Sequence, residues 1–132
     1  MATLDDTRAV YGRAWLTKDP DERRRLLEEC FAEDGLFVDP TGPVIARGRQ
    51  ALFQHISGLW GDTASLEHQV GSGSSIRVEA VGRVEENLDG WFRFRFRWHT
   101  PEGQTVMMGT DFGRVSADGR FELIVVFIDP IE

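Results

Sequence analysis

The feature that most constrains the fold is a change in the spacing of apolar residues near the middle of the chain. Up to Trp60, apolar side chains recur every three or four residues, which is the spacing of one helix face. From Ile76 onward they alternate with polar side chains, as in a strand with one buried face. Helical segments followed by strands, in 132 residues, predict a single α+β domain spanning residues 1–132.

Capping residues give the expected bounds of the helices. Thr3 and Asp6 form an approximate capping box for a first helix. Asp19 is an expected N-cap for a second helix, whose apolar stripe runs to Cys30 and Phe31 and which is expected to end at Gly35. A third helix is expected at about 49–60.

Turn residues separate the strands. A short strand is expected at 36–39, with 44–46 pairing back on it, because a proline and a turn follow Asp39. Long strands are expected at 76–86, 91–100, 104–115 and 121–129, with a weaker candidate at 66–70. Hairpin turns join the long strands, which predicts an antiparallel meander with the three helices on one of its faces.

Charge argues against two classes of partner. The net charge of −7 gives an acidic surface that repels phosphate backbones and anionic membranes, so neither nucleic acid nor membrane is an expected partner. The segment 91–98 alternates aromatic residues with arginines, and period two places the arginines together on one face. We expect Arg93, Arg95 and Arg97 to lie outside any pocket and to pair with Glu79, Glu85 or a second subunit.

Cysteine and histidine favour ordinary roles. The single cysteine, Cys30, lies on an apolar helix stripe, which favours a buried thiol and a reducing cytoplasm. His55, His68 and His99 share no ligand-like spacing, so we expect no metal site and no cofactor. His55 falls on the inward side of the third helix, where it is either a core histidine or part of a pocket.

Two aspartates and one tyrosine are the candidate catalytic residues. Asp39 ends an apolar strand and Asp111 interrupts another, and a carboxylate there is costly unless it is paired, solvated or protonated. Each also has a simpler interpretation, Asp39 as a turn-forming residue and Asp111 as a strand residue that faces water. With Tyr11 on an inward helix face, they suggest a pocket with one base and two hydrogen-bond donors.

Several segments together carry a family resemblance. The runs 11–15, 31–40, 110–112 and 118–120 are, in order, YGRAW, FAEDGLFVDP, TDF and DGR. With Asp19, and with Gly48 opening a helix, they resemble the nuclear-transport-factor-2-like superfamily, and within it SnoaL-like proteins and ketosteroid isomerases. The resemblance covers nearly the whole chain. It implies a cone-shaped, curved antiparallel sheet wrapped around the N-terminal helices, a cystatin-like α+β barrel, and a homodimer through the outer sheet face.

The resemblance also implies roles for the three residues. Asp39 matches the general base of the isomerases, Asp111 the protonated aspartic acid of the oxyanion hole, and Tyr11 its tyrosine. In ketosteroid isomerases the oxyanion-hole acid stays neutral so that it can donate a hydrogen bond. The implied function is proton transfer next to the carbonyl of a small, largely apolar compound. Expected pocket residues, besides His55, are Phe37, Phe53, Trp60, Phe92, Met107, Met108, Val125 and Phe127.

Two alternatives stay open at this point. The same pocket is compatible with a non-catalytic binding protein, in which Tyr11, Asp39 and Asp111 satisfy a polar ligand. It is also compatible with a hydrolase or dehydratase, in which Asp39 or Asp111 activates water. The superfamily hosts all of these activities, so the fold alone does not choose between them.

Overall fold

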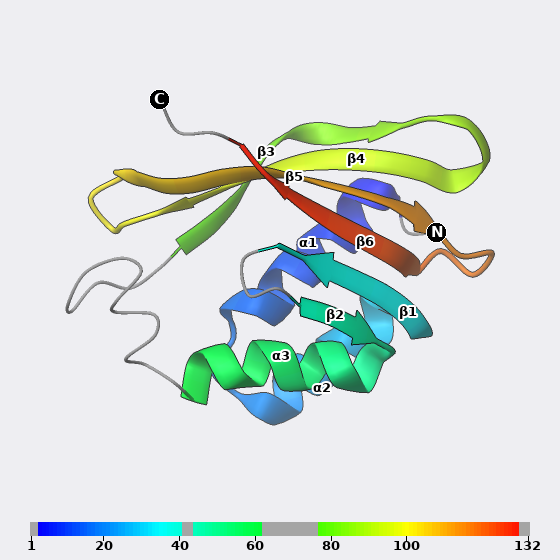
Figure 1. The fold of residues 1–132 in the computed structure, drawn as a ribbon, viewed down its shortest axis with the longest axis horizontal. Helices are drawn as coiled ribbons and strands as arrows, with labels where there is room; N and C mark the ends of the chain where they lie inside the picture. The colour runs from blue at the N-terminus through cyan, green and yellow to red at the C-terminus, as the bar shows by residue number, and fades with distance from the viewer. Residues whose placement is uncertain (1–2, 41–43, 62–76, 130–132) are drawn as a thin grey trace.

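The computed structural model describes residues 3–40, 44–61 and 77–129 (Figure 1). The helices are α1 (Leu4–Leu16), α2 (Pro20–Cys30) and α3 (Arg49–Gly61). The strands are β1 (Phe31–Asp39), β2 (Val44–Arg47), β3 (Arg77–Glu86), β4 (Trp91–His99), β5 (Thr105–Val115) and β6 (Phe121–Ile128), with a short 3-10 turn η1 (Leu88–Gly90) before β4. The weak strand expected at 66–70 lies outside the described residues. Within the described part of the chain, no helix is long and apolar enough to cross a membrane.

The helix N-termini form as their capping residues predict. The backbone N–H of Thr3 donates to Asp6 at 2.9 Å, and the N–H of Asp6 donates to the Thr3 hydroxyl at 3.1 Å, so the capping box is complete. The side chain of Asp19 accepts from the N–H of Asp21 at 3.0 Å and caps α2.

The end of α2 differs from the prediction. The helix ends at Cys30, and Phe31 is already the first residue of β1, so the expected helix end at Gly35 is wrong. Gly35 serves packing instead: a Cβ at this position would lie 2.6 Å from the Phe31 ring. The pairing of β1 with β6 is irregular between Phe31 and Leu36, which places this close contact at a bulge.

The six strands form one curved sheet in the order β2-β1-β6-β5-β4-β3, with the helices gathered on one side (Figure 1). The α+β prediction is confirmed, and the meander β3–β6 is antiparallel as expected. The pair β1–β6 is parallel, so the sheet is mixed. This pair places the first strand of the chain beside the last.

The inner face of the sheet carries the core. Phe92 and Phe94 of β4 are buried there, as are Ile124 and Val126 of β6. On β5 the corresponding positions are Gly109, Asp111 and Gly113. A Cβ at Gly109 would lie 2.4 Å from the Phe96 ring, and one at Gly113 would lie 1.9 Å from the carbonyl oxygen of Leu123. Asp111 therefore lies between two positions where only glycine fits.

Polar contacts fix α1 against the edge strand β3. The pairing of β3 with β4 is irregular between Val81 and Glu85. Asp5 accepts the backbone N–H of Val84 at 3.1 Å, and Arg8 donates to the carbonyl of Gly82 at 2.6 Å. The helix thus satisfies backbone groups that the bulge leaves out of the ladder, and this holds the face of α1 that carries Tyr11 in place.

The outer face of the sheet carries ion pairs. Arg93 lies 2.9 Å from Glu85, Arg97 lies 2.6 Å from Glu79, and Arg95 lies 3.2 Å from Asp129. The predicted pairing with Glu79 and Glu85 is confirmed for Arg97 and Arg93, whereas Arg95 pairs with Asp129, which the prediction did not name.

Candidate active site

Tyr11 enters the core from the middle of α1. It is 5% exposed and meets Trp15, Phe94 and Phe121 edge to face, with ring centroids 5.6 to 6.4 Å apart. Burial, followed by the negative charge of Asp111, raises the pKa of the Tyr11 phenol well above its usual value. The phenol therefore stays protonated and can donate a hydrogen bond.

Asp111 lies on the inner face of β5, directly between Phe94 of β4 and Val126 of β6. It is 5% exposed, and its Oδ1 is buried without a hydrogen-bond partner among the described residues. Burial, with a smaller contribution from the charge of Asp39, raises the pKa of the Asp111 carboxyl well above its usual value. The raised pKa favours the neutral acid, whose O–H group would be a donor inside the core, and the alternative interpretation that Asp111 faces water is wrong.

Asp39 and His55 meet where β1 ends beside α3. The Nε2 atom of His55 lies 4.0 Å from Oδ2 of Asp39, and the two side chains are 19% and 12% exposed. Burial lowers the pKa of His55, and the charge of Asp39 opposes that effect without cancelling it. His55 is therefore neutral near pH 7. The sequence placed both residues in a pocket but did not indicate that they form a pair.

Trp15 is a member of this site that the sequence analysis did not include among the pocket residues. Its ring lies 5.6 Å from Phe37, 5.9 Å from His55 and 6.4 Å from Trp98. It also hydrogen-bonds Tyr11, which partly offsets the rise in the pKa of the phenol. The spacing Tyr11–Trp15, one helical turn on the same face, is the signal that could have identified it.

The other expected pocket residues divide between the two faces of the sheet. Phe37 contacts His55 at 5.7 Å, and Phe92 is buried in a stack with Phe94 and Phe121. Met107 shares the inner face with its partner Trp98. Three expectations are wrong, because the register and the burial pattern place their side chains on the outer face: Met108, Val125 and Phe127. The side chain of Trp60 lies outside the described part of the structure.

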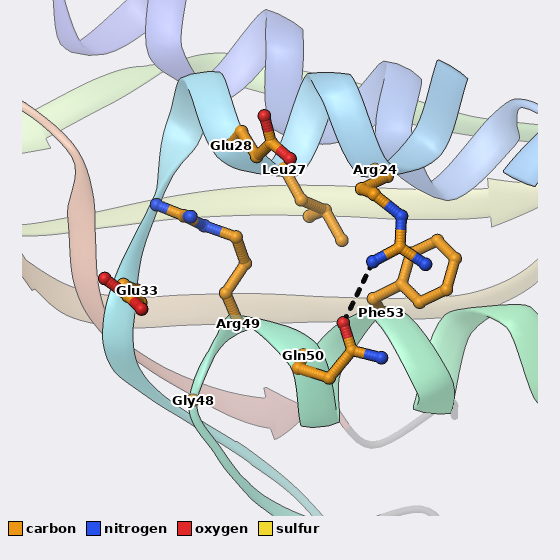
Figure 2. A pocket seen from close by; sticks show the side chains of 8 residues that line it. All are labelled: Arg24, Leu27, Glu28, Glu33, Gly48, Arg49, Gln50 and Phe53. Carbon is orange, nitrogen blue, oxygen red and sulfur yellow. Dashed lines mark hydrogen bonds between the residues drawn. The ribbon is translucent and has the colours of Figure 1, made fainter. Parts of the chain in front are cut away.

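Phe53 belongs to a different region, the groove between α2 and α3 (Figure 2). The groove has a volume of about 310 Å³. The Arg24 guanidinium lies 4.2 Å from the centre of the Phe53 ring and donates to Gln50 at 3.1 Å. Arg49 donates from Nε to the carbonyl of Phe31 at 2.8 Å. These contacts fasten α3 to α2 and β1, and the expectation that Phe53 lines the pocket with Asp39 is wrong.

Metal and thiol chemistry receive no support from the described residues. In the ranges given above, no group of three histidine, cysteine or acidic side chains could hold a metal ion. Cys30 is buried, and burial raises the pKa of its thiol to about 12, which is opposite to what a thiolate nucleophile requires.

The SnoaL-like domain model matches residues 7–124, which is most of the chain. The chain belongs to the SnoaL-like family. The fold is that of the nuclear-transport-factor-2-like superfamily. No match was found among curated proteins.

Solved structures of similar fold include proposed enzymes. A proposed SnoaL-like isomerase from Agrobacterium tumefaciens is 26% identical, with a TM-score of 0.75, and the match covers 98% of this chain and all of the other. A proposed polyketide cyclase from Sinorhizobium meliloti is 19% identical, with a TM-score of 0.63, and the match covers 92% and 94% of the two chains. A proposed ketosteroid isomerase from Kribbella flavida is 12% identical, with a TM-score of 0.64, and the match covers 98% and 79%.

Proposed function

We propose that this SnoaL-like protein is a cofactor-independent enzyme that moves a proton at the carbon next to a carbonyl group, in an isomerisation or cyclisation. One observation carries the proposal: Asp111 is buried with an oxygen that has no partner among the described residues, and burial raises the pKa of its carboxyl and of the equally buried Tyr11 phenol. A buried polar atom of this kind costs stability, and its usual explanation is a function.

The proposed reaction uses one proton acceptor and two hydrogen-bond donors. The Asp39 carboxylate takes the proton from the carbon next to the carbonyl, and the electron pair of that bond moves to the carbonyl oxygen. The O–H groups of Tyr11 and Asp111 donate to the resulting oxyanion. Protonated Asp39 then returns the proton at a second carbon. In a cyclisation, the enolate carbon instead attacks a second carbonyl carbon of the same substrate, and Asp39 gives its proton to the alkoxide that forms.

The aromatic surroundings favour an apolar substrate. Trp15, Phe37 and Trp98 lie around His55 and Asp39, and Phe94 contacts Tyr11. Such rings exclude water, which strengthens hydrogen bonds to a developing negative charge. The ligand is therefore a small, largely apolar carbonyl compound, and the proposed isomerase and cyclase among the similar structures use the same fold.

A non-catalytic binding protein is the second candidate. The same unpartnered Asp111 oxygen would be satisfied by a polar ligand atom without any reaction. The two candidates differ at Asp39, which a binding protein does not need as a base.

The test is a rate measurement on β,γ-unsaturated cyclic ketones of increasing size, followed by the absorbance of the conjugated product. Asp39→Asn keeps the shape of the side chain but removes the base. We expect it to lower kcat/KM by on the order of 10³-fold. Asp34→Asn is the matched control, because Asp34 is an exposed residue of the same strand. Equal turnover by wild type and Asp39→Asn would contradict the proposal and favour the binding protein.

We further propose that the protein works as a homodimer in the reducing cytoplasm, joined through the outer sheet face. Large apolar side chains are exposed there on neighbouring strands, with Phe127 57% and Phe112 42% exposed. Exposed apolar surface of this kind is typical of a contact surface. The free, buried thiol of Cys30 is compatible with a reducing compartment.

A further inference from the structure

Asp39 and His55 are two mostly buried side chains that lie close together. At 4.0 Å, Nε2 of His55 is within ion-pair range of Oδ2 of Asp39 but beyond hydrogen-bond range. The neutral ring therefore lies beside the carboxylate without donating to that oxygen.

The rings on either side of His55 hold it in this place. Trp15 meets the imidazole edge to face at 5.9 Å, and Phe37 lies against it at 5.7 Å. These two residues come from α1 and β1, so the histidine is enclosed between elements from both sides.

The ionisable groups around His55 leave one clear electrostatic partner. From β1, Asp39 faces the ring and is the charge that acts on the His55 pKa. From α1 and β5, Tyr11 and Asp111 are buried, and burial raises the pKa of both, which favours their uncharged forms. From α2, Arg23 donates to the hydroxyl of Ser57 at 2.9 Å, two residues beyond His55 on α3. Among the described residues, then, Asp39 is the group whose charge acts on the His55 pKa.

We propose that His55 is a positioning residue that acts through Asp39 and switches the base off in acid. The proposal rests on the function proposed above. With the ring neutral, the carboxylate keeps its negative charge and its basicity. When the ring takes a proton from solvent, Nε2–H donates to Oδ2, and the resulting ion pair holds Asp39 away from substrate and weakens it as a base.

If His55 has this role, the fall in kcat/KM at low pH should follow the protonation of His55. Since the ion pair occupies the carboxylate that acts as the base, we expect wild-type kcat/KM to fall by about tenfold or more as His55 becomes protonated at acid pH. If His55 were only a core residue, the fall in kcat/KM at low pH would follow the protonation of the carboxyl groups alone.

The first measurement needs no substrate. Histidine ring resonances are followed by NMR across pH in wild type and Asp39→Asn, with His55→Gln identifying the His55 signals. Removing the Asp39 charge should move the His55 midpoint to lower pH, because that charge stabilises the protonated ring. The matched control is Glu79→Gln, since Glu79 lies 3.9 Å from His99 and not beside His55. An unchanged His55 midpoint in Asp39→Asn would overturn the proposal.

The second measurement is the pH profile of kcat/KM for a ketone that the wild type converts. In His55→Gln, which cannot be protonated, the fall in kcat/KM on the acid side should move to lower pH. His99→Gln should keep the wild-type profile. If His55→Gln lowers activity equally at every pH without moving this fall, the residue is structural and the proposal is wrong.

The two measurements separate this proposal from the function on which it rests. If no ketone is turned over, the proton-transfer function fails, and the NMR comparison alone decides whether His55 and Asp39 are coupled. If turnover depends on Asp39 but the fall in kcat/KM at low pH is the same in His55→Gln, the base function stands and the role of His55 is overturned.

Discussion

The two faces of β4 and β5 treat polar side chains in opposite ways. On the outer face, Arg93 and Arg97 each lie against a glutamate at the surface, where water and a partner share the solvation of both charges. On the inner face, Asp111 is buried between phenylalanine and valine with one oxygen unpartnered among the described residues. Surface pairs of this kind contribute about 0–1 kcal/mol, whereas a buried polar atom without a partner costs about 1–3 kcal/mol.

The difference shows where a function is to be sought. A strand alternates its side chains between the faces, so the same few residues build both environments. The outer face satisfies its charges locally and has no need of a ligand to complete them. The inner face holds a buried acid whose pKa is raised and one of whose oxygens lacks a partner among the described residues, and the carbonyl oxygen of a ligand would supply that partner.

The difference between the two faces should have its largest effect on the affinity for a fluorescent polycyclic phenol. The phenol oxygen stands in for the enolate oxygen. Tyr11→Phe should weaken binding by about 1.5–3 kcal/mol, as expected for a donor lost to a charged acceptor. Asp111→Asn should weaken it less, since an amide N–H still donates, and Asp39→Asn should tighten it by removing a repelling charge. The measurement is a fluorescence titration across pH.

A control on the outer face completes this experiment. Arg95→Ala removes a charge that lies beside Asp129 at the surface and should leave the affinity for the phenol unchanged. Equal binding by wild type and the three inner-face variants would contradict the oxyanion-hole assignment of Tyr11 and Asp111.

The pH dependence of stability should show a smaller contrast. The native pKa of Asp111 is raised by burial, so the folded protein binds the proton more tightly than the unfolded chain does. Its contribution to stability is then fully present below the unfolded pKa of about 4 and falls with rising pH, by up to about 1.4 kcal/mol per pH unit, until the native carboxyl ionises. Asp111→Asn, which cannot ionise, should therefore stabilise the protein more at mildly alkaline pH than at mildly acidic pH.

Urea unfolding at the two pH values measures this difference. Arg93→Ala on the outer face should change the free energy of unfolding by less than about 1 kcal/mol, with little dependence on pH over the same range. A wild-type protein and an Asp111→Asn variant with parallel pH curves would show that Asp111 is ionised in the folded state.

A substitution on the outer face should have the smallest effect on the folded monomer. Phe127→Glu places a charge in the exposed apolar surface that we propose as the dimer contact. We expect it to convert a dimer into a monomer in sedimentation experiments, with the fold kept because Phe127 does not enter the core. A wild-type protein that sediments as a monomer would contradict the dimer proposal.

The sequence predicts where the helices and strands lie. It predicts less well which side chains of each strand face inward and which strands pair with one another. Capping residues placed the starts of α1 and α2 correctly because those signals are local. Period two indicated that Met107 and Met108 face opposite sides, but not which of them faces inward, since both are apolar. The parallel pair β1–β6 also has no local signal, because it joins segments from distant parts of the chain.

The site was predictable in its residue types and not in its contacts. Tyr11, Asp39 and Asp111 stood out because polar groups interrupted apolar patterns, and the family resemblance gave them roles. The contact of His55 with Asp39 depends on how α3 docks against the end of β1, and the inclusion of Trp15 depends on how α1 crosses both. Neither arrangement follows from the spacing of residues within one element.

The parallel pairing of β1 with β6 has a consequence for folding. Asp39 and His55 lie on β1 and α3, which are close in the chain, whereas Tyr11 and Asp111 come from its first helix and its next-to-last strand. Contacts between distant segments form slowly, because the closure of a long loop precedes them. A chain still being synthesised cannot hold Asp111 against the helices until β6 is made and docks beside β1. Competence to bind a ligand should thus arise with the last strand, and refolding followed by phenol fluorescence should lag behind the formation of the helices.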